Sequence, residues 1–195
     1  MPTRTRLPRA TRERQILDAA RDVFAERGFQ NASMDAVAER VGVTKPVLYT
    51  HFGSKEGLLL ALLAQARAEL LDVTTAAAAA AQNPEDVLRR GTLAFFTYVE
   101  RKPAWSLLCA ESGVGGDALE GIRAQQTDFV AALLAAQFPD GPAQQLMGWA
   151  HVVVGACERL ANWRANDPTV TAERATDYLM DLVWTGLGNA AQSAG

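Results

Sequence analysis

Polar side chains that can form hydrogen bonds are concentrated on one side of a predicted helix at residues 44–52. The side chains on this face are Lys45, Tyr49, Thr50 and His51. Ammonium and hydroxyl groups can donate to the base edges and phosphates that line the major groove of DNA. The helix begins at Thr44 and Lys45, and a recognition helix usually enters the groove by this end. The pattern therefore predicts a DNA-contacting face on this helix.

The sequence contains few residues that could form an enzyme active site or a metal site. It has two histidines, His51 and His151, and its two cysteines do not form a Cys-x-x-Cys pair, which excludes a site with several histidine ligands. Cys109 and His151 could act as nucleophile and base, but both stand in apolar surroundings. The glycine-rich residues 113–116 lack the Lys-Ser or Lys-Thr pair of a phosphate-binding loop. We therefore expect no enzyme, metal or cofactor, while a helical interaction protein that does not bind DNA remains an alternative.

Three helices must position the polar face. The first is predicted at residues 10–27 and ends at Gly28 in a left-handed cap. Ser33 is a good N-cap for the second helix, Gly42 breaks that helix, and Thr44 is an N-cap for the third. The apolar residues expected to seal the three helices together are Phe24, Val37, Ala38, Val41, Leu48 and Phe52. This arrangement has the geometry of a helix-turn-helix.

Helical periodicity continues through the rest of the chain, so the predicted fold class is all-α. A long helix begins at Lys55 and ends at Asn83 and Pro84. Further helices are predicted near residues 84–101, 103–112, 117–137, 142–165 and 170–191. We therefore expect an N-terminal arm and three-helix DNA-binding domain at residues 1–54. The long helix would join it to a helical bundle for effector binding and dimerisation, within residues 55–195.

Charge is distributed unevenly along the chain. Residues 1–55 contain 10 basic and 6 acidic side chains, the remaining residues contain 9 and 16, and the net charge is −3. A basic head on an acidic body is typical of a local polyanion site. Arginines of the N-terminal arm could follow the phosphate backbone, enter a minor groove or remain solvated: Arg4, Arg6, Arg9, Arg12 and Arg14. The chain shows neither a signal-like segment nor a run of about 20 apolar residues, so we expect a cytoplasmic protein with no membrane span.

The segment GFQNASMDAVAERVGVTKPVLYTHFGSKEGLL resembles the DNA-binding signature of the TetR family of bacterial regulators, over about residues 12–62. The residues that carry the resemblance most specifically are Gly42, Val43, Leu48, Tyr49, Phe52, Lys55 and Leu58. The resemblance implies that helix 44–52 lies in the major groove.

The resemblance also implies a division of labour among the residues. It assigns phosphate contacts to Ser33, Tyr49, His51 and Lys55. Lys45 and Val47 would then read bases, which agrees with the chemistry of guanine acceptors and of a thymine methyl group. The alternative is a tight helical corner in which Tyr49 packs inward and both lysines are solvated charges.

A single recognition helix makes few base contacts, so we expect a homodimer on a palindromic operator. The resemblance implies that the last two helices form a four-helix bundle with a second copy. The expected interface residues are Leu179, Val183, Trp184, Gly186 and Leu187. The alternative is that these residues cover only their own core.

The middle helices carry many large side chains with a few polar groups among them, as small-molecule sites do. The residues expected to line an effector cavity are Phe95, Tyr98, Trp105, Cys109, Phe129, Trp149 and His151. Ordinary core packing is the alternative for each. We expect a repressor that a hydrophobic or aromatic effector releases from DNA, with the long helix as the lever that changes the spacing of the recognition helices.

Overall fold

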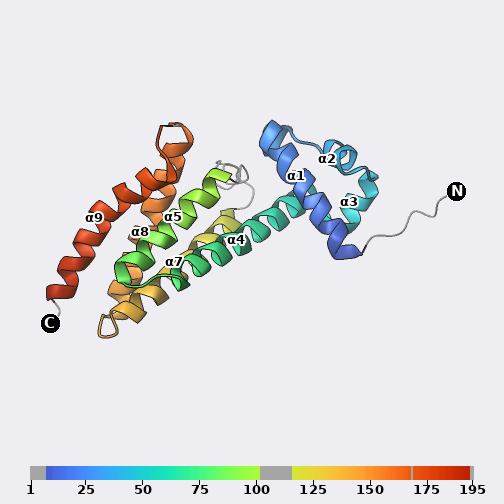
Figure 1. Ribbon diagram of the computed structural model, residues 1–195. Helices are drawn as coiled ribbons and strands as arrows, with labels where there is room; N and C mark the ends of the chain where they lie inside the picture. Colours follow the sequence, from blue (N-terminus) through green and yellow to red (C-terminus); the bar gives the residue numbers. More distant parts are fainter. Residues whose placement is uncertain (1–7, 102–115, 168, 194–195) are drawn as a thin grey trace. The chain divides into compact units, whose positions relative to one another are not determined.

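Figure 1 shows the computed structural model of the chain, which describes residues 8–101, 116–167 and 169–193. Side chains are described in these ranges except at residues 116–119, 122 and 186–193. The described residues form eight α-helices and no strand: α1 (Arg9–Asn31), α2 (Met34–Val41), α3 (Lys45–Phe52), α4 (Lys55–Ala79), α5 (Pro84–Arg101), α7 (Gly116–Gln137), α8 (Ala143–Ala165) and α9 (Ala172–Ser193). This confirms the predicted all-α fold class. The helix predicted near residues 103–112 lies outside the described residues.

The chain divides into two compact units, and one of the divisions falls inside α4. Of the described residues, the N-terminal unit comprises 8–66 with 116–118, and the C-terminal unit comprises 67–101, 119–167 and 169–193. The sequence analysis placed the boundary before residue 55 instead. The difference arises because the first turns of α4 belong by their contacts to the N-terminal unit, where their buried leucines are Leu58, Leu59, Leu62 and Leu63.

The core of the N-terminal unit takes one face from each of its helices. Its fully buried large side chains include Ile16, Val23 and Phe24 of α1, Val37 of α2, Leu48 of α3 and Leu58 of α4, each 0% exposed. α2 packs against both α1 and α3. Of the residues predicted to seal these helices, Phe24, Val37, Ala38 and Leu48 are buried, whereas Val41 and Phe52 are partly exposed.

Two glycines take backbone conformations that other residues rarely adopt. Gly42 has φ 74° and ψ 38°, and its N–H donates to the carbonyls of Ala38 and Glu39, so it ends α2 as a left-handed cap, where the sequence predicted a helix break. Gly28 has φ 71° and ψ 156°, which is not a left-handed cap. α1 bends there and continues to Asn31, one turn beyond the predicted end.

In the C-terminal unit α5 packs against both α8 and α9, which also pack against each other, and Figure 1 shows these helices side by side. Phe96 of α5, Ala150 of α8 and Leu179 of α9 are at most 2% exposed. Cys157 of α8 is also buried, and this burial raises the pKa of its thiol to about 12. The thiol is therefore protonated at neutral pH, which agrees with a core residue rather than a nucleophile.

None of the described helices combines the length and the apolar character that crossing a membrane requires.

Replacing Gly28 by Ala should destabilise the protein more than replacing Gly42 by Ala. At both positions an added Cβ would meet no atom within 4 Å, so any loss comes from backbone strain. The conformation of Gly28 is essentially restricted to glycine, and we expect Gly28→Ala to lower the free energy of unfolding by about 2–3 kcal/mol. For Gly42→Ala, in the more accessible left-handed region, we expect about 1 kcal/mol. Urea unfolding followed by circular dichroism measures both, and equal losses would contradict this reading of Gly28.

Candidate nucleic-acid interface

The position of Leu48 determines which side of α3 faces outward. Leu48 is 0% exposed and is the buried residue of this eight-residue helix. Lys45, Tyr49 and Thr50 are exposed, Tyr49 to 44%. Thr44 stands at the N-cap position of α3, but its hydroxyl makes no capping hydrogen bond and also faces outward. The helix therefore presents a polar face to solvent, as the sequence pattern predicted.

Ser33 and Thr50 use their hydroxyl groups within the helices. The Oγ of Ser33 accepts from the backbone N–H of Ala36 at 3.2 Å and so caps α2. The Oγ1 of Thr50 donates to the carbonyl of Pro46 at 2.9 Å. Because the Ser33 hydroxyl accepts in its cap, its proton is left to donate to a phosphate. Val47, expected to read a base, is half-buried at the edge of the polar face.

Lys45 forms an ion pair with an acidic residue of the preceding helix. Its Nζ donates to Oδ2 of Asp35 at 2.8 Å, and this hydrogen bond raises the pKa of Lys45. The side chains are 45% and 69% exposed, so the pair is solvated. An exposed pair of this kind is readily exchanged for another partner.

His51 is held against α1 rather than standing free on α3. Its side chain is 14% exposed, and its Nδ1–H donates to Oε1 of Glu13 at 3.1 Å. Glu13 also accepts from Arg9 at 2.8 Å, and the hydrogen bonds from Arg9 and then His51 lower the pKa of this carboxyl group. Of the two ring nitrogens, Nε2 is the one left for a phosphate contact, and it can donate there only when the ring carries both protons; this contact stays a prediction.

Lys55 has a role in the structure that the sequence analysis did not foresee. Its Nζ donates to the carbonyls of Phe29 at 2.8 Å, Ala32 at 3.0 Å and Gln30 at 3.3 Å. The ammonium group also lies 4.5 Å from the ring centroid of Phe29. Three carbonyls take up the three ammonium protons, so in this conformation Lys55 ties the start of α4 to the end of α1. A phosphate contact by Lys55 would have to replace one of these bonds and stays a prediction.

The signal for this role was present in the sequence. The last carbonyls of a helix have no N–H donors within it, and a lysine can donate to them. What the sequence does not reveal is that the helix end at residues 29–32 and Lys55 meet in space.

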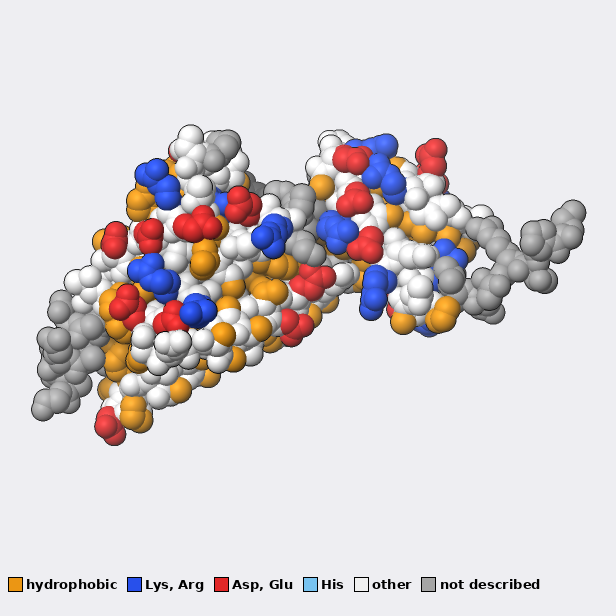
Figure 2. All heavy atoms as spheres, viewed as in Figure 1, with side chains coloured by type: hydrophobic (Ala, Val, Ile, Leu, Met, Phe, Trp, Pro, Cys, Tyr) orange, Lys and Arg blue, Asp and Glu red, His pale blue; other side chains and the backbone are white. Residues whose placement is uncertain are grey.

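Four described basic side chains of the N-terminal unit are paired with acidic ones, namely Arg9, Arg21, Arg40 and Lys45. Figure 2 shows Lys and Arg interleaved with Asp and Glu on this unit rather than a uniformly basic patch. Arg40 makes a two-pronged contact with Glu26 at 2.7 and 3.0 Å, and Arg21 lies 3.0 Å from Asp18. A polyanion must therefore displace an acidic partner at these residues, whereas Arg14 and Arg27 are exposed and form no ion pair with a described residue.

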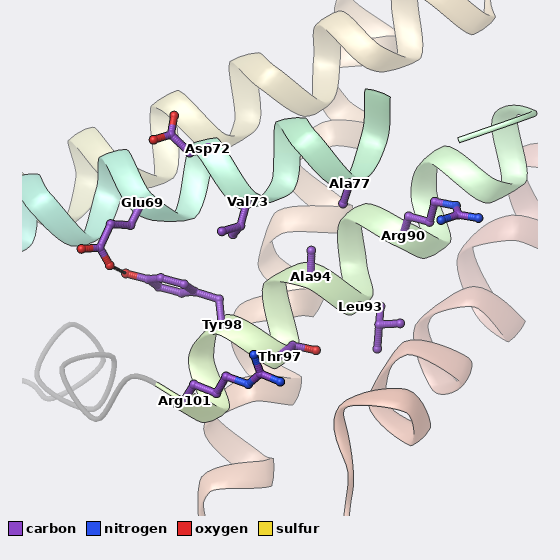
Figure 3. Close-up of a pocket in the computed structure, with 10 residues that line it drawn as sticks. All are labelled: Glu69, Asp72, Val73, Ala77, Arg90, Leu93, Ala94, Thr97, Tyr98 and Arg101. Carbon is purple, nitrogen blue, oxygen red and sulfur yellow. Dashed lines mark hydrogen bonds between the residues drawn. The ribbon is translucent and has the colours of Figure 1, made fainter. Parts of the chain in front are cut away.

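The C-terminal unit contains a groove of about 700 Å³ between α4 and α5 (Figure 3). The residues that line it are Glu69, Asp72, Val73, Ala77, Arg90, Leu93, Ala94, Thr97, Tyr98 and Arg101. Most of its surface is apolar, and Tyr98 donates to Glu69 at 3.3 Å at one end. Arg90 is paired with Asp86 at 2.7 Å, whereas Arg101 forms no ion pair with a described residue. The lining therefore combines apolar side chains with two carboxylates, of Glu69 and Asp72, and two guanidinium groups, of which Arg101 has no described ion-pair partner.

The residues predicted to line an effector cavity are distributed over several environments. Tyr98 lines the groove, and Phe95 is buried beside Phe96. Trp149 packs edge to face on Phe138 within the cluster around Leu134, Leu146 and Ala150, and Phe129 is half-buried. His151 is exposed on α8, so the expectation that it lines a cavity is not met in the single chain. Trp105 and Cys109 lie outside the described residues.

The residues predicted for a dimer interface also differ in exposure. Leu179 is 2% exposed and belongs to its own core, because its side of α9 packs on α5 and α8. Val183 and Trp184 are half-buried. The side chains of Gly186 and Leu187 lie outside the described residues. The apolar side chains that stand out on α8 and α9 are instead Val152, at 61% exposed, and Leu182, at 81%.

Two family models match this chain. The model described as bacterial regulatory proteins, tetR family, matches residues 16–62. The model described as tetracyclin repressor-like, C-terminal domain, matches residues 84–186. The first model covers the helix-turn-helix, and the second covers most of the helical bundle. Both parts of the chain therefore match regulators of the same type.

Individual relatives and solved structures that are similar to this chain are also transcriptional regulators. The HTH-type transcriptional activator FasR of Mycolicibacterium smegmatis is 30% identical over 94% of this chain and 86% of its own length. The structure of a TetR-like transcriptional regulator from Rhodococcus sp. RHA1 is 32% identical, covers 94% of this chain and 99% of that one, and has a TM-score of 0.73. The regulator FadR from Bacillus subtilis, solved with stearoyl-CoA, is 16% identical, covers 87% and 96%, and has a TM-score of 0.76, which is a likeness of fold.

Replacing Lys55 by Met should destabilise the protein, because three carbonyls at the end of α1 would lose their charged donor. We expect the free energy of unfolding to fall by about 1–3 kcal/mol. The matched control is Lys45→Met, which removes a lysine from an exposed pair and should leave the melting temperature unchanged. Thermal unfolding followed by circular dichroism measures both variants. Equal melting temperatures for Lys55→Met and the unmodified protein would show that the carbonyl contacts contribute little.

Proposed function

The chain belongs to the tetR family of bacterial regulatory proteins, and from this membership we propose that two copies bind a palindromic operator through α3 and release it when a small effector binds. Members of this family are DNA-binding transcriptional regulators and not enzymes. The observation that carries the proposal is the orientation of α3, in which Leu48 is buried while Lys45 and Tyr49 face outward.

At the operator, α3 would lie in the major groove with its N-terminal end foremost. Lys45 would reach the acceptors of guanine, and Val47 would pack on a thymine methyl group. Phosphates would be held by Ser33, Tyr49 and His51, whose contacts position the helix without reading sequence. The free hydroxyl of Thr44 would add a contact at the helix start.

Dimerisation would use apolar side chains that a single chain leaves exposed. Leu182 and Val152 are the most exposed large apolar residues among those described, on α9 and α8 respectively. We therefore replace Leu179 by Leu182 in the proposed interface and retain Val183 and Trp184. A two-fold arrangement of this kind can present two recognition helices to successive major grooves about 34 Å apart.

Repression follows from the simplest use of such a dimer. A protein seated on a promoter excludes RNA polymerase without any further contact, whereas activation needs a surface that recruits the polymerase. The relative FasR is described as an activator, so the position of the operator relative to the promoter decides the direction of regulation. We propose that this protein represses transcription where its operator overlaps the promoter.

The effector that best suits the groove is an amphiphile with an acyl chain and an anionic head. Val73, Leu93 and Ala94 supply apolar surface, and the guanidinium of Arg101 supplies a counter-charge. FadR from Bacillus subtilis, which has a similar fold, was solved with stearoyl-CoA, a molecule of this class. A long-chain acyl-CoA is therefore the proposed effector.

The effector would act through α4, because this helix contributes Val73 to the groove and Leu58 to the core beneath the recognition helix. If the effector binds better when the two α3 helices are wrongly spaced, it must weaken operator binding by the same coupling free energy. A shift of α4 that moves α3 is the proposed route.

Selection of bound fragments from genomic DNA with the purified protein should yield a palindromic site, bound by an even number of chains. Separate Lys45→Ala and Tyr49→Ala variants should each bind this site at least about tenfold more weakly, since each loses a direct contact. Their melting temperatures should not change, because both side chains are exposed. Arg174→Ala removes an exposed cation from α9 and should bind normally. Unchanged affinity in both α3 variants would argue for a helical protein that does not use α3 on DNA.

Stearoyl-CoA should release the protein from the selected site, measured by the fluorescence anisotropy of labelled duplex. Val73→Asp puts a carboxylate into the apolar groove and should raise the concentration needed for release by about tenfold or more. Operator affinity without stearoyl-CoA should stay the same. Ala135→Asp adds the same charge at an exposed position of α7 and serves as the control. Release that is equally sensitive in the Val73→Asp variant would place the effector elsewhere.

A further inference from the structure

We propose that Asp35 is a specificity-determining residue, which holds the ammonium group of Lys45 for a base contact and withholds it from phosphates. This inference rests on the proposed function, because it assigns a role within the α3 interface. Asp35 would act through Lys45 and is therefore a positioning residue.

The two side chains meet where both helices of the helix-turn-helix begin. Asp35 lies in the first turn of α2, and Lys45 is the first residue of α3. The Nζ of Lys45 and the Oδ2 of Asp35 are 2.8 Å apart. Because the first residues of a recognition helix enter the groove, the pair holds the ammonium group at the part of α3 nearest to the base edges.

The number of protons on the ammonium group makes a base contact compatible with the ion pair. A lysine has three N–H donors, and Asp35 uses one of them. The remaining two suffice for N7 and O6 of a single guanine. Lys45 can therefore read a base while it keeps its carboxylate partner.

A phosphate contact by Lys45 is not compatible with the ion pair to Asp35 in the same way. The phosphate brings a second negative charge to an ammonium group that already has one, and the two anions repel each other. Lys45 must then either leave Asp35 or hold two like charges close together. On DNA of the wrong sequence, where no guanine is correctly placed, a phosphate is the remaining partner, so Asp35 penalises that complex selectively.

The same helix offers a matched control. Glu39 is an exposed acidic residue of α2, and no ion pair joins its carboxylate to a described residue. Glu39→Gln removes the same charge from the same helix as Asp35→Asn but does not release Lys45. A general effect of charge can thus be separated from an effect on Lys45.

The test compares the affinity of each variant for two duplexes. One carries the selected palindrome, and the other has the same length and base composition in shuffled order. We expect Asp35→Asn to bind the shuffled duplex about 3- to 10-fold more tightly, and the palindrome with less than about a twofold change. The salt dependence of binding to the shuffled duplex should steepen by about one released ion per chain.

Three further variants identify the cause. Asp35→Glu should keep the preference for the palindrome, and Glu39→Gln should leave it unchanged. In a Lys45→Met background, Asp35→Asn should no longer alter the preference, since there is no ammonium group to release. Asp35→Ser is a second neutral variant, and melting curves verify that each protein is folded. An unchanged preference in Asp35→Asn, or an equal fall with Glu39→Gln or in the Lys45→Met background, would overturn the proposal.

The experiment distinguishes a failure of the proposed function from a failure of the role proposed for Asp35. If the unmodified protein prefers no duplex, the proposed function fails together with the role of Asp35. If it prefers the palindrome and Asp35→Asn retains that preference, only the role of Asp35 is wrong.

Discussion

The burial of Leu48 in the core of the N-terminal unit is the constraint on which the proposed interface depends. α3 has eight residues, and its one fully buried side chain sets the rotation of the helix about its axis. Successive residues turn by about 100°, so Thr50 must lie on the side opposite to Leu48. The contact that α2 makes with both α1 and α3 then fixes the position of this polar face relative to the rest of the unit.

Ion pairs within the unit determine how the polar face can be used. Asp35 holds Lys45, Glu13 holds His51, and Glu26 holds Arg40. Part of the positive charge of the N-terminal unit is therefore engaged before any DNA arrives. Such a surface binds by exchanging partners, which favours a duplex that offers well-placed acceptors over one that offers only phosphates. Lys55 differs, because its partners are carbonyls that have no other charged donor, and it stabilises the unit itself.

The sequence predicted the structural features that depend on residues close together in the chain. The helix periodicity, the break at Gly42 and the exposure of Lys45, Tyr49 and Thr50 on α3 were correctly predicted, because each depends on residues within a few positions. Contacts between distant segments were not predicted: Glu13 with His51, and the carbonyls near residue 30 with Lys55. The interface prediction on α9 wrongly included the buried Leu179, because Leu179 and the exposed Leu182 are three positions apart and both fit a helical apolar stripe. Which of the two faces its own core is decided by the packing of α5 and α8.

Methylation interference on the selected duplex tests most directly whether α3 reads the major groove. Methylation at guanine N7 alters the major groove, whereas methylation at adenine N3 alters the minor groove. The account predicts that guanine N7 methylation in each half-site blocks binding, at positions about one helical turn or a multiple of it apart, and that the block is relieved in Lys45→Met. Interference confined to adenine N3, or guanine interference that is unchanged in Lys45→Met, would contradict it.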